Sequence, residues 1–89
     1  MAEPKAASAW DEVAACKTLF QVHEALVRLR PTDRADAARW QAYRLRCAAA
    51  YDRIADIDRG HHHEALYWAQ RERKHANEIA TSRTRLSGW

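Results

Sequence analysis

Helix breakers are almost absent from this chain. Only two glycines and two prolines occur among its 89 residues, whereas alanine is abundant and β-branched residues are few. This composition favours helix nearly everywhere, and no stretch alternates apolar and polar residues as a half-buried strand does. We therefore predict an all-α protein. At this length the chain forms one domain, residues 1–89, whose core gives only marginal stability.

The first helix is predicted over residues 9–30. Ser8 and Asp11 have the spacing of a capping box, with the shorter acid in the second place. Pro31 ends the helix, because the residue before a proline avoids helical geometry. Residues 1–7 then form a short flexible lead.

Two further helices are predicted, over residues 33–59 and 62–84. Thr32 or Asp33 can cap the first of them. Gly60 supplies the left-handed residue that commonly ends a helix. The connections between successive helices are therefore short.

The apolar faces of these helices predict a bundle. Short connections make neighbouring helices antiparallel, so we predict a three-helix up-down-up bundle. The alternative is a long helical hairpin that dimerises into a bundle. The helix over 33–59 carries a stripe of large side chains and, nearly opposite, a second stripe of small ones. This second stripe predicts an interface with another copy of the chain or with a partner protein, and it contains Ala35, Ala38, Ala42, Leu45 and Ala49.

Three polar residues fall within or at the edge of apolar helix faces: His23, Glu72 and His75. In an up-down-up bundle they share one level, and the antiparallel central helix places Arg46 there too. The sequence thus predicts a buried polar layer of His23, Arg46, Glu72 and His75. The favoured interpretation is an ion pair between Glu72 and Arg46 or His75 that fixes the register of the helices.

A metal site is the alternative interpretation of the same residues. Glu72 and His75 have the Glu-x-x-His spacing found in di-iron bundles, and His23 completes a set suited to zinc or ferrous iron. The helix over 33–59 contains no glutamate, however, and a di-iron centre needs further carboxylates. We therefore expect no cofactor.

His61, His62 and His63 lie at the start of the last predicted helix. Consecutive helical residues point in different directions, so at most one of the three enters the core. We expect a solvated helix start that retains nickel or zinc in vitro. The functional alternative is a pH switch, because an imidazolium is unfavourable at the positive end of a helix.

Arg39, Arg46 and Arg53 repeat every seven residues, about 10.5 Å apart along a helix. Such a row suits phosphates or an acidic protein surface. Asp36 and Asp56 lie three residues from the outer two arginines and can neutralise them. With a net charge of only +3, the row favours a protein partner over nucleic acid.

Tryptophan is unusually frequent, with four residues in the chain. Trp10 falls on the polar side of the first predicted helix. The C-terminal tail, residues 85–89, contains Leu86 and Trp89. Exposed tryptophans often mark contact surfaces. We therefore add Trp10, Leu86 and Trp89 to the arginine row as predicted binding residues.

The sequence shows no arrangement that indicates catalysis, such as a glycine-rich phosphate loop or a nucleophile paired with a base. Cys16 and Cys47 lie in apolar stripes without metal-binding spacing, which is typical of reduced core residues in a cytoplasmic protein. No apolar run approaches the roughly 18 residues of a membrane span.

These observations lead us to expect a small non-catalytic protein-binding module, such as an adaptor, inhibitor or assembly subunit. It would act through its helix faces, and self-association is consistent with the small core. The first alternative is a nucleic-acid-binding protein that uses the arginine row, and the second is a metal-binding bundle.

Overall fold

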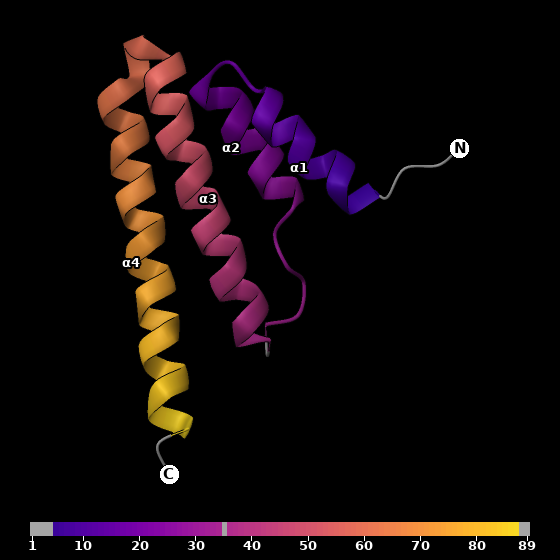
Figure 1. The fold of residues 1–89 in the computed structure, drawn as a ribbon, viewed down its shortest axis with the longest axis vertical. Helices are drawn as coiled ribbons and strands as arrows, with labels where there is room; N and C mark the ends of the chain where they lie inside the picture. The colour runs from indigo at the N-terminus through magenta and orange to yellow at the C-terminus, as the bar shows by residue number, and fades with distance from the viewer. Residues whose placement is uncertain (1–4, 35, 88–89) are drawn as a thin grey trace.

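The computed structural model describes the backbone of residues 5–34 and 36–87 and the side chains of residues 9–34 and 36–84. Within these ranges the protein is all-α, without a β-strand, as predicted (Figure 1). Its helices are α1 (Lys5–Ala15), α2 (Leu19–Arg28), α3 (Ala37–Ile57) and α4 (His62–Ser87), with a short 3-10 helix, η1 (Arg59–His61), between α3 and α4.

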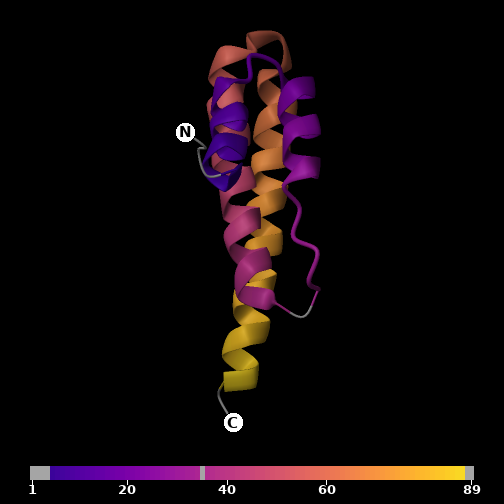
Figure 2. The same cartoon turned by 90° about the vertical axis from the view of Figure 1, so that its right-hand side faces the viewer.

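The two long helices, α3 and α4, form an antiparallel pair (Figures 1 and 2). Alanines of α4 face α3, and Ala65 and Ala69 are fully buried. Side chains this small let the two helix axes approach closely. Ile54 of α3 is also fully buried, so the centre of this pair forms the core of the molecule.

The predicted single helix over residues 9–30 is wrong, because the chain turns between α1 and α2. The Thr18 hydroxyl accepts a hydrogen bond from the Gln21 N–H and so caps a new helix. The Lys17 N–H donates to the Gln21 side chain in the same turn. The turn lets side chains of both halves reach the core, although Phe20 and Val27 of α2 stay exposed, at 68% and 60%.

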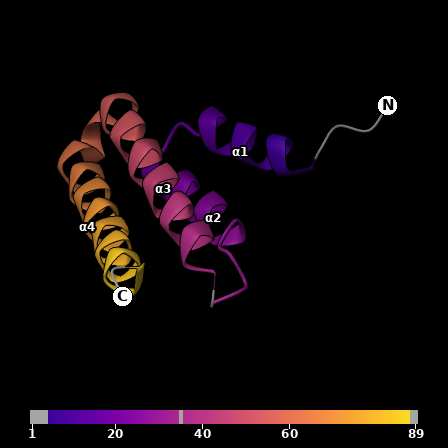
Figure 3. The same ribbon diagram turned by 60° about the horizontal axis from the view of Figure 1, so that its bottom comes forward.

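α1 and α2 consequently cover different parts of the α3–α4 pair. Val13 of α1, Cys16 just after its end, and Val22 and Leu26 of α2 all join the buried cluster. α2 lies against α3, whereas α1 points away from the pair towards the N-terminus (Figures 1 and 3). The fold is therefore a small four-helix bundle, and the predicted three-helix arrangement is corrected.

Three predicted helix boundaries also change. The N-cap of α3 is Asp36, which accepts a hydrogen bond from the Arg39 N–H, and neither Thr32 nor Asp33 takes that role. α4 continues to Ser87, so most of the predicted tail is helical, and residues 88–89 lie outside the described part of the chain. In the same way, Lys5 begins α1 inside the predicted lead.

Gly60 does not end α3 in the left-handed conformation that the sequence predicts. No glycine in the described residues has a positive φ. α3 instead ends at Ile57, and Gly60 lies inside η1, with Asp58 as N-cap. The chain reverses direction between α3 and α4 through this one 3-10 turn, and α4 begins at the next residue.

The molecule is thin for its length. The Cα positions extend over 46 × 40 × 14 Å, with a radius of gyration of 14.4 Å. A compact domain of this length has a radius of gyration of about 12 Å. Few large side chains are fully buried in so flat a bundle, and the two largest are Ile54 and Val22.

Both cysteines are buried thiols without a disulfide. Burial raises the pKa of the Cys47 thiol to about 12, so it stays protonated at neutral pH. None of the described helices has the length and the apolar character needed to cross a membrane.

Candidate functional site

The buried polar layer predicted from the sequence does not form, because its members have other partners. Glu72, 7% exposed, pairs with Arg44 and not with Arg46. The Arg44 guanidinium donates to both carboxylate oxygens, at 2.9 and 3.3 Å. Arg44 and Arg46 differ by about 200° around the helix, so the predicted helix rotation was wrong.

His23 lies in an aromatic environment. Its Nδ1 is hydrogen-bonded to the Tyr51 hydroxyl at 2.7 Å, and the Trp68 ring meets it edge-on, with centroids 5.1 Å apart. Burial lowers the pKa of His23, and the nearby Glu64 carboxylate opposes that shift. His23 is thus a half-buried histidine, neutral at pH 7, that joins α2 to α3 and α4.

The metal interpretation gains no support from the geometry. His75 pairs at the surface with Glu78, at 3.2 Å, and so does not meet His23 and Glu72 in one site. In residues 9–34 and 36–84, histidine, cysteine, aspartate and glutamate side chains nowhere gather in groups of three that could hold a metal ion.

Asp58, at the end of α3, has a role that sequence reasoning missed. Its carboxylate accepts a hydrogen bond from the Leu19 N–H at 2.9 Å and another from His61 Nδ1 at 2.9 Å. The Leu19 hydrogen bond, with that of His61, lowers the pKa of Asp58. One aspartate therefore ties the first turn of α2 to the α3–α4 connection, and no local sequence signal reveals a contact across 39 positions.

The three histidines of the run have different environments. His61 contacts Asp58, and His62 Nδ1 lies 2.8 Å from the Ala55 carbonyl oxygen, to which it donates. His63 is exposed. His61 is exposed as well and only His62 is half-buried, which agrees with a solvated helix start, while two of the three histidines also hold the α3–α4 connection together.

The arginine row divides into two parts. Arg53 donates to the Cys16 carbonyl oxygen at 3.4 Å, just after α1 ends. Arg46 lies over the Trp10 ring, 4.7 Å from its centroid, and Trp10 packs half-buried against Tyr43. The predicted binding residues Arg39, Arg46 and Trp10 therefore meet between α1 and α3, and Arg53 does not join them.

Two other predicted binding residues are not placed. Trp89 and the side chain of Leu86 lie outside the described residues. The second stripe of α3 is exposed as predicted at Ala38, Ala42, Leu45 and Ala49, with Leu45 49% exposed, and Ala35 is not described. Of the described residues of this stripe, Ala42 lines a cleft with α1 and the segment after α2.

A cleft of about 410 Å³ lies between α1, the segment after α2 and α3. Arg30 lines this cleft together with Arg39 and Arg46 of the arginine row. Sequence reasoning missed Arg30, because its position depends on the path of the chain from α2 back to α3. We call this site the arginine cleft, and it is lined by Trp10, Leu29, Arg30, Pro31, Thr32, Arg39, Ala42, Tyr43 and Arg46.

A second concave site of about 580 Å³ lies between the first half of α3 and the second half of α4. α2 covers the same side of the α3–α4 pair nearer the connection, where His23 contacts both helices. We call the uncovered part the α3–α4 groove, and it is lined by Arg34, Ala37, Trp40, Arg44, His75, Glu78, Ile79, Ser82 and Arg83.

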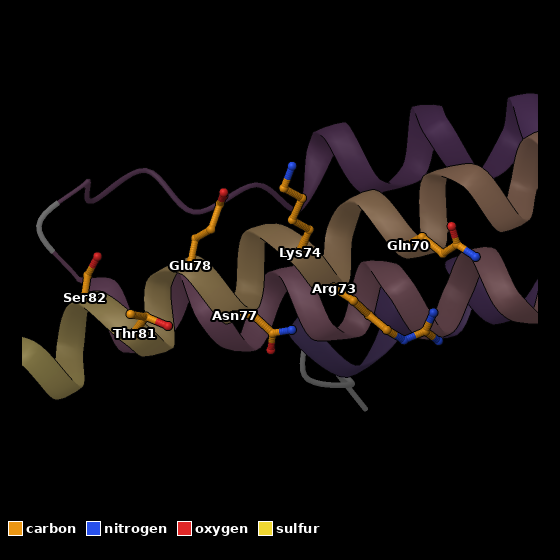
Figure 4. A pocket seen from close by; sticks show the side chains of 7 residues that line it. All are labelled: Gln70, Arg73, Lys74, Asn77, Glu78, Thr81 and Ser82. Carbon is orange, nitrogen blue, oxygen red and sulfur yellow. The ribbon is translucent and has the colours of Figure 1, made fainter.

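A further hollow, of about 720 Å³, follows the outer side of α4 (Figure 4). All the residues that line it are polar and come from this one helix, and their side chains spread apart along it. A strip without an opposing wall cannot enclose a ligand. The arginine cleft and the α3–α4 groove each have walls from more than one element, and we take these two as the candidate sites.

The sequence matches no protein-family model and no curated protein, and the fold matches no solved structure.

Proposed function

We propose that this protein is a small non-catalytic protein-binding module whose α3–α4 groove receives an acidic amphipathic helix of a partner protein. The observation that carries the proposal is that α2 fills only part of the α3–α4 face. Beyond α2, the groove is open and of the size that a helical segment can enter with one or two side chains.

The floor of the groove is apolar. The half-buried Trp40 and Ile79 both line it, one from each helix. α2 shows which kind of segment this face accepts, because it buries Leu19, Val22 and Leu26 at helical spacing. A partner helix with two or three apolar residues at the same spacing fits the continuation of that face.

The rim of the groove is basic. Arg34 and Arg83 line it, with Arg44, whose charge is paired with Glu72, and with Glu78, which pairs with His75. This charge favours a partner with acidic residues beside its apolar ones, because complementary charges speed association and select among partners.

A photo-crosslinking amino acid at Ser82, on the edge of the groove, tests the proposal in the cells that make the protein. The matched control carries the same group at Asn77, on the outer side of α4 (Figure 4). We expect a crosslinked partner protein from position 82 and none from position 77. A product at twice the chain mass would identify a second copy as the occupant.

Two substitutions make the test specific. Ile79→Asp should abolish the product from position 82, and Thr81→Asp, on the outer side, should leave it unchanged. Far-UV circular dichroism checks that both variants fold, as expected for residues outside the buried cluster. Equal crosslinking at both positions, or full retention in Ile79→Asp, would contradict the proposal.

Nucleic acid is the rival partner, and the divided arginine row weakens its case. Binding of nucleic acid along α3 would need all three arginines of the row to face the phosphates. Arg53, however, donates to a carbonyl oxygen just after the end of α1. A gel shift at two salt concentrations separates the two functions, because binding to phosphates weakens steeply with salt. We expect no shift at low salt.

A further inference from the structure

The arginine cleft has features that protein binding through the α3–α4 groove does not use. It lies on α1, α3 and the segment after α2, away from the second half of α4. Its volume of about 410 Å³ falls within the range of small-molecule sites, about 300–1,000 Å³.

Three guanidinium groups line this one cleft: Arg30 after α2, and Arg39 and Arg46 two turns apart on α3. Among the described side chains, no ion pair joins any of the three to a carboxylate. The nearest acid along α3, Asp36, uses its carboxylate to cap the helix. Three arginines on the walls of one cleft give it a positive charge that attracts an anion.

The remaining walls are aromatic and apolar. Arg46 lies over the Trp10 ring, 4.7 Å from its centroid, and this contact holds the planar guanidinium beside another residue of the cleft wall. The Tyr43 hydroxyl donates to the Leu26 carbonyl oxygen at 2.6 Å, which fixes its ring in the wall. Burial raises the pKa of Tyr43, with Arg30 beside it opposing the shift, so the hydroxyl stays neutral and does not repel an anion.

We propose that the arginine cleft binds a small organic phosphate, with the phosphate monoester held by Arg30, Arg39 and Arg46. An aromatic or heterocyclic body would then lie against Leu29, Pro31 and the ring of Trp10. A phosphate dianion matches several guanidiniums better than a carboxylate does, because it has three acceptor oxygens and nearly two charges, whereas a carboxylate has two oxygens and one charge.

Calorimetric titration of the full chain with phenyl phosphate, inorganic phosphate and benzoate tests this inference. We expect phenyl phosphate to bind about tenfold more tightly than either of the other two, since it alone supplies both the dianion and the ring. Its affinity should fall as salt is raised.

Substitutions locate the binding. Arg39→Gln and Arg46→Lys should each weaken phenyl phosphate about tenfold, and Arg46→Lys keeps the charge while removing the fork. Arg71→Gln, a matched loss of an arginine that stacks on Trp68 of α4, should change the affinity less than about twofold. Thermal melts establish that each variant is folded.

Absence of saturable binding by phenyl phosphate would overturn the inference. Equal binding of phenyl and inorganic phosphate, or equal weakening by Arg71→Gln and Arg39→Gln, would also overturn it. Because none of these variants lies in the α3–α4 groove, failure here leaves the crosslinking from position 82 unaffected.

Discussion

Arg44 and Glu72 form the one buried ion pair in the described part of the molecule. The Glu72 carboxylate has little contact with water, and the Arg44 side chain is 25% exposed. A buried carboxylate needs its cation, since losing the partner leaves a desolvated charge. The pair therefore joins α3 to α4 in the part of the bundle near the end of α2.

Arg44→Ala should lower the free energy of unfolding by about 2 kcal/mol, less than for a fully buried pair because Arg44 reaches water. Arg46→Ala, which loses only a contact with Trp10, should cost less than about 1 kcal/mol. Urea denaturation of both variants measures the difference. Equal losses of unfolding free energy in the two variants would contradict Arg44 as the partner of Glu72 and favour Arg46.

Gly60→Ala should leave the free energy of unfolding unchanged or raise it by about 0.5 kcal/mol. The reason is that alanine has less conformational freedom than glycine in the unfolded chain. The φ of Gly60 is not positive, and an added Cβ would meet only Asp58 Oδ1, at 4.0 Å. Thermal unfolding measures this. A loss of 1 kcal/mol or more would show that Gly60 has the left-handed conformation expected from the sequence.

At the scale of elements, the separation of α1 and α2 depends on two caps of different origin. Thr18 is local to α2, whereas Asp58 reaches the Leu19 N–H from the far end of α3. The α2 helix is short, and isolated helices of 10 residues are unstable in water. Its position therefore depends on both caps and on the burial of its apolar side.

Asp58→Ala should lower the Tm by about 5 °C, because α2 loses a cap and the His61 contact is lost with it. Asp56→Ala, which removes an exposed pair with Arg59, is the matched control and should change the Tm little. Differential scanning calorimetry compares the two. Equal shifts would mean that Asp58 does not hold α2.

The pH dependence of Asp58 follows from its lowered pKa. The unfolded chain takes up this proton near the ordinary value of 3.8, and the folded protein does so only at lower pH. The stabilisation that the Asp58 carboxylate gives the folded protein is therefore complete above pH 3.8. It is lost as the pH falls through the pKa that Asp58 has in the folded protein. Asp58→Ala should show a weaker loss of stability over that range.

At the scale of the whole molecule, the flat shape leaves stability dependent on few buried contacts. His23 lies where α2, α3 and α4 meet, so its protonation affects all three helices together. Charging it would place a cation against Trp68 and Tyr51 in a partly dry site.

Global stability should therefore fall as the pH drops below 6.5, the ordinary pKa of histidine. The folded pKa is lower, so the unfolded state binds more protons in this range, and the stabilisation present above 6.5 is lost towards the folded pKa. Urea midpoints at pH 7.5, 6 and 5 measure this. His23→Gln should flatten the dependence and His63→Gln should not. An unchanged slope in His23→Gln would assign the effect to another group.

The amino-acid sequence by itself determined the helical class, the antiparallel pairing of the two long helices and the placement of Glu72 and His23 on inward faces. These features follow from composition and from the 3.6-residue period, which act within a few turns of chain. The exposed alanine stripe of α3 followed from the same period.

Tertiary structure decided the partners of those residues. Arg44 rather than Arg46 meets Glu72 because helix rotation is set by packing against both neighbours, and a two-residue difference moves a side chain to the opposite side. The break before Leu19 depends on Asp58, 39 residues away, and the arginine cleft depends on the path between α2 and α3. Local patterns contain no information on such distant contacts, which is why both sites emerged only from the folded chain.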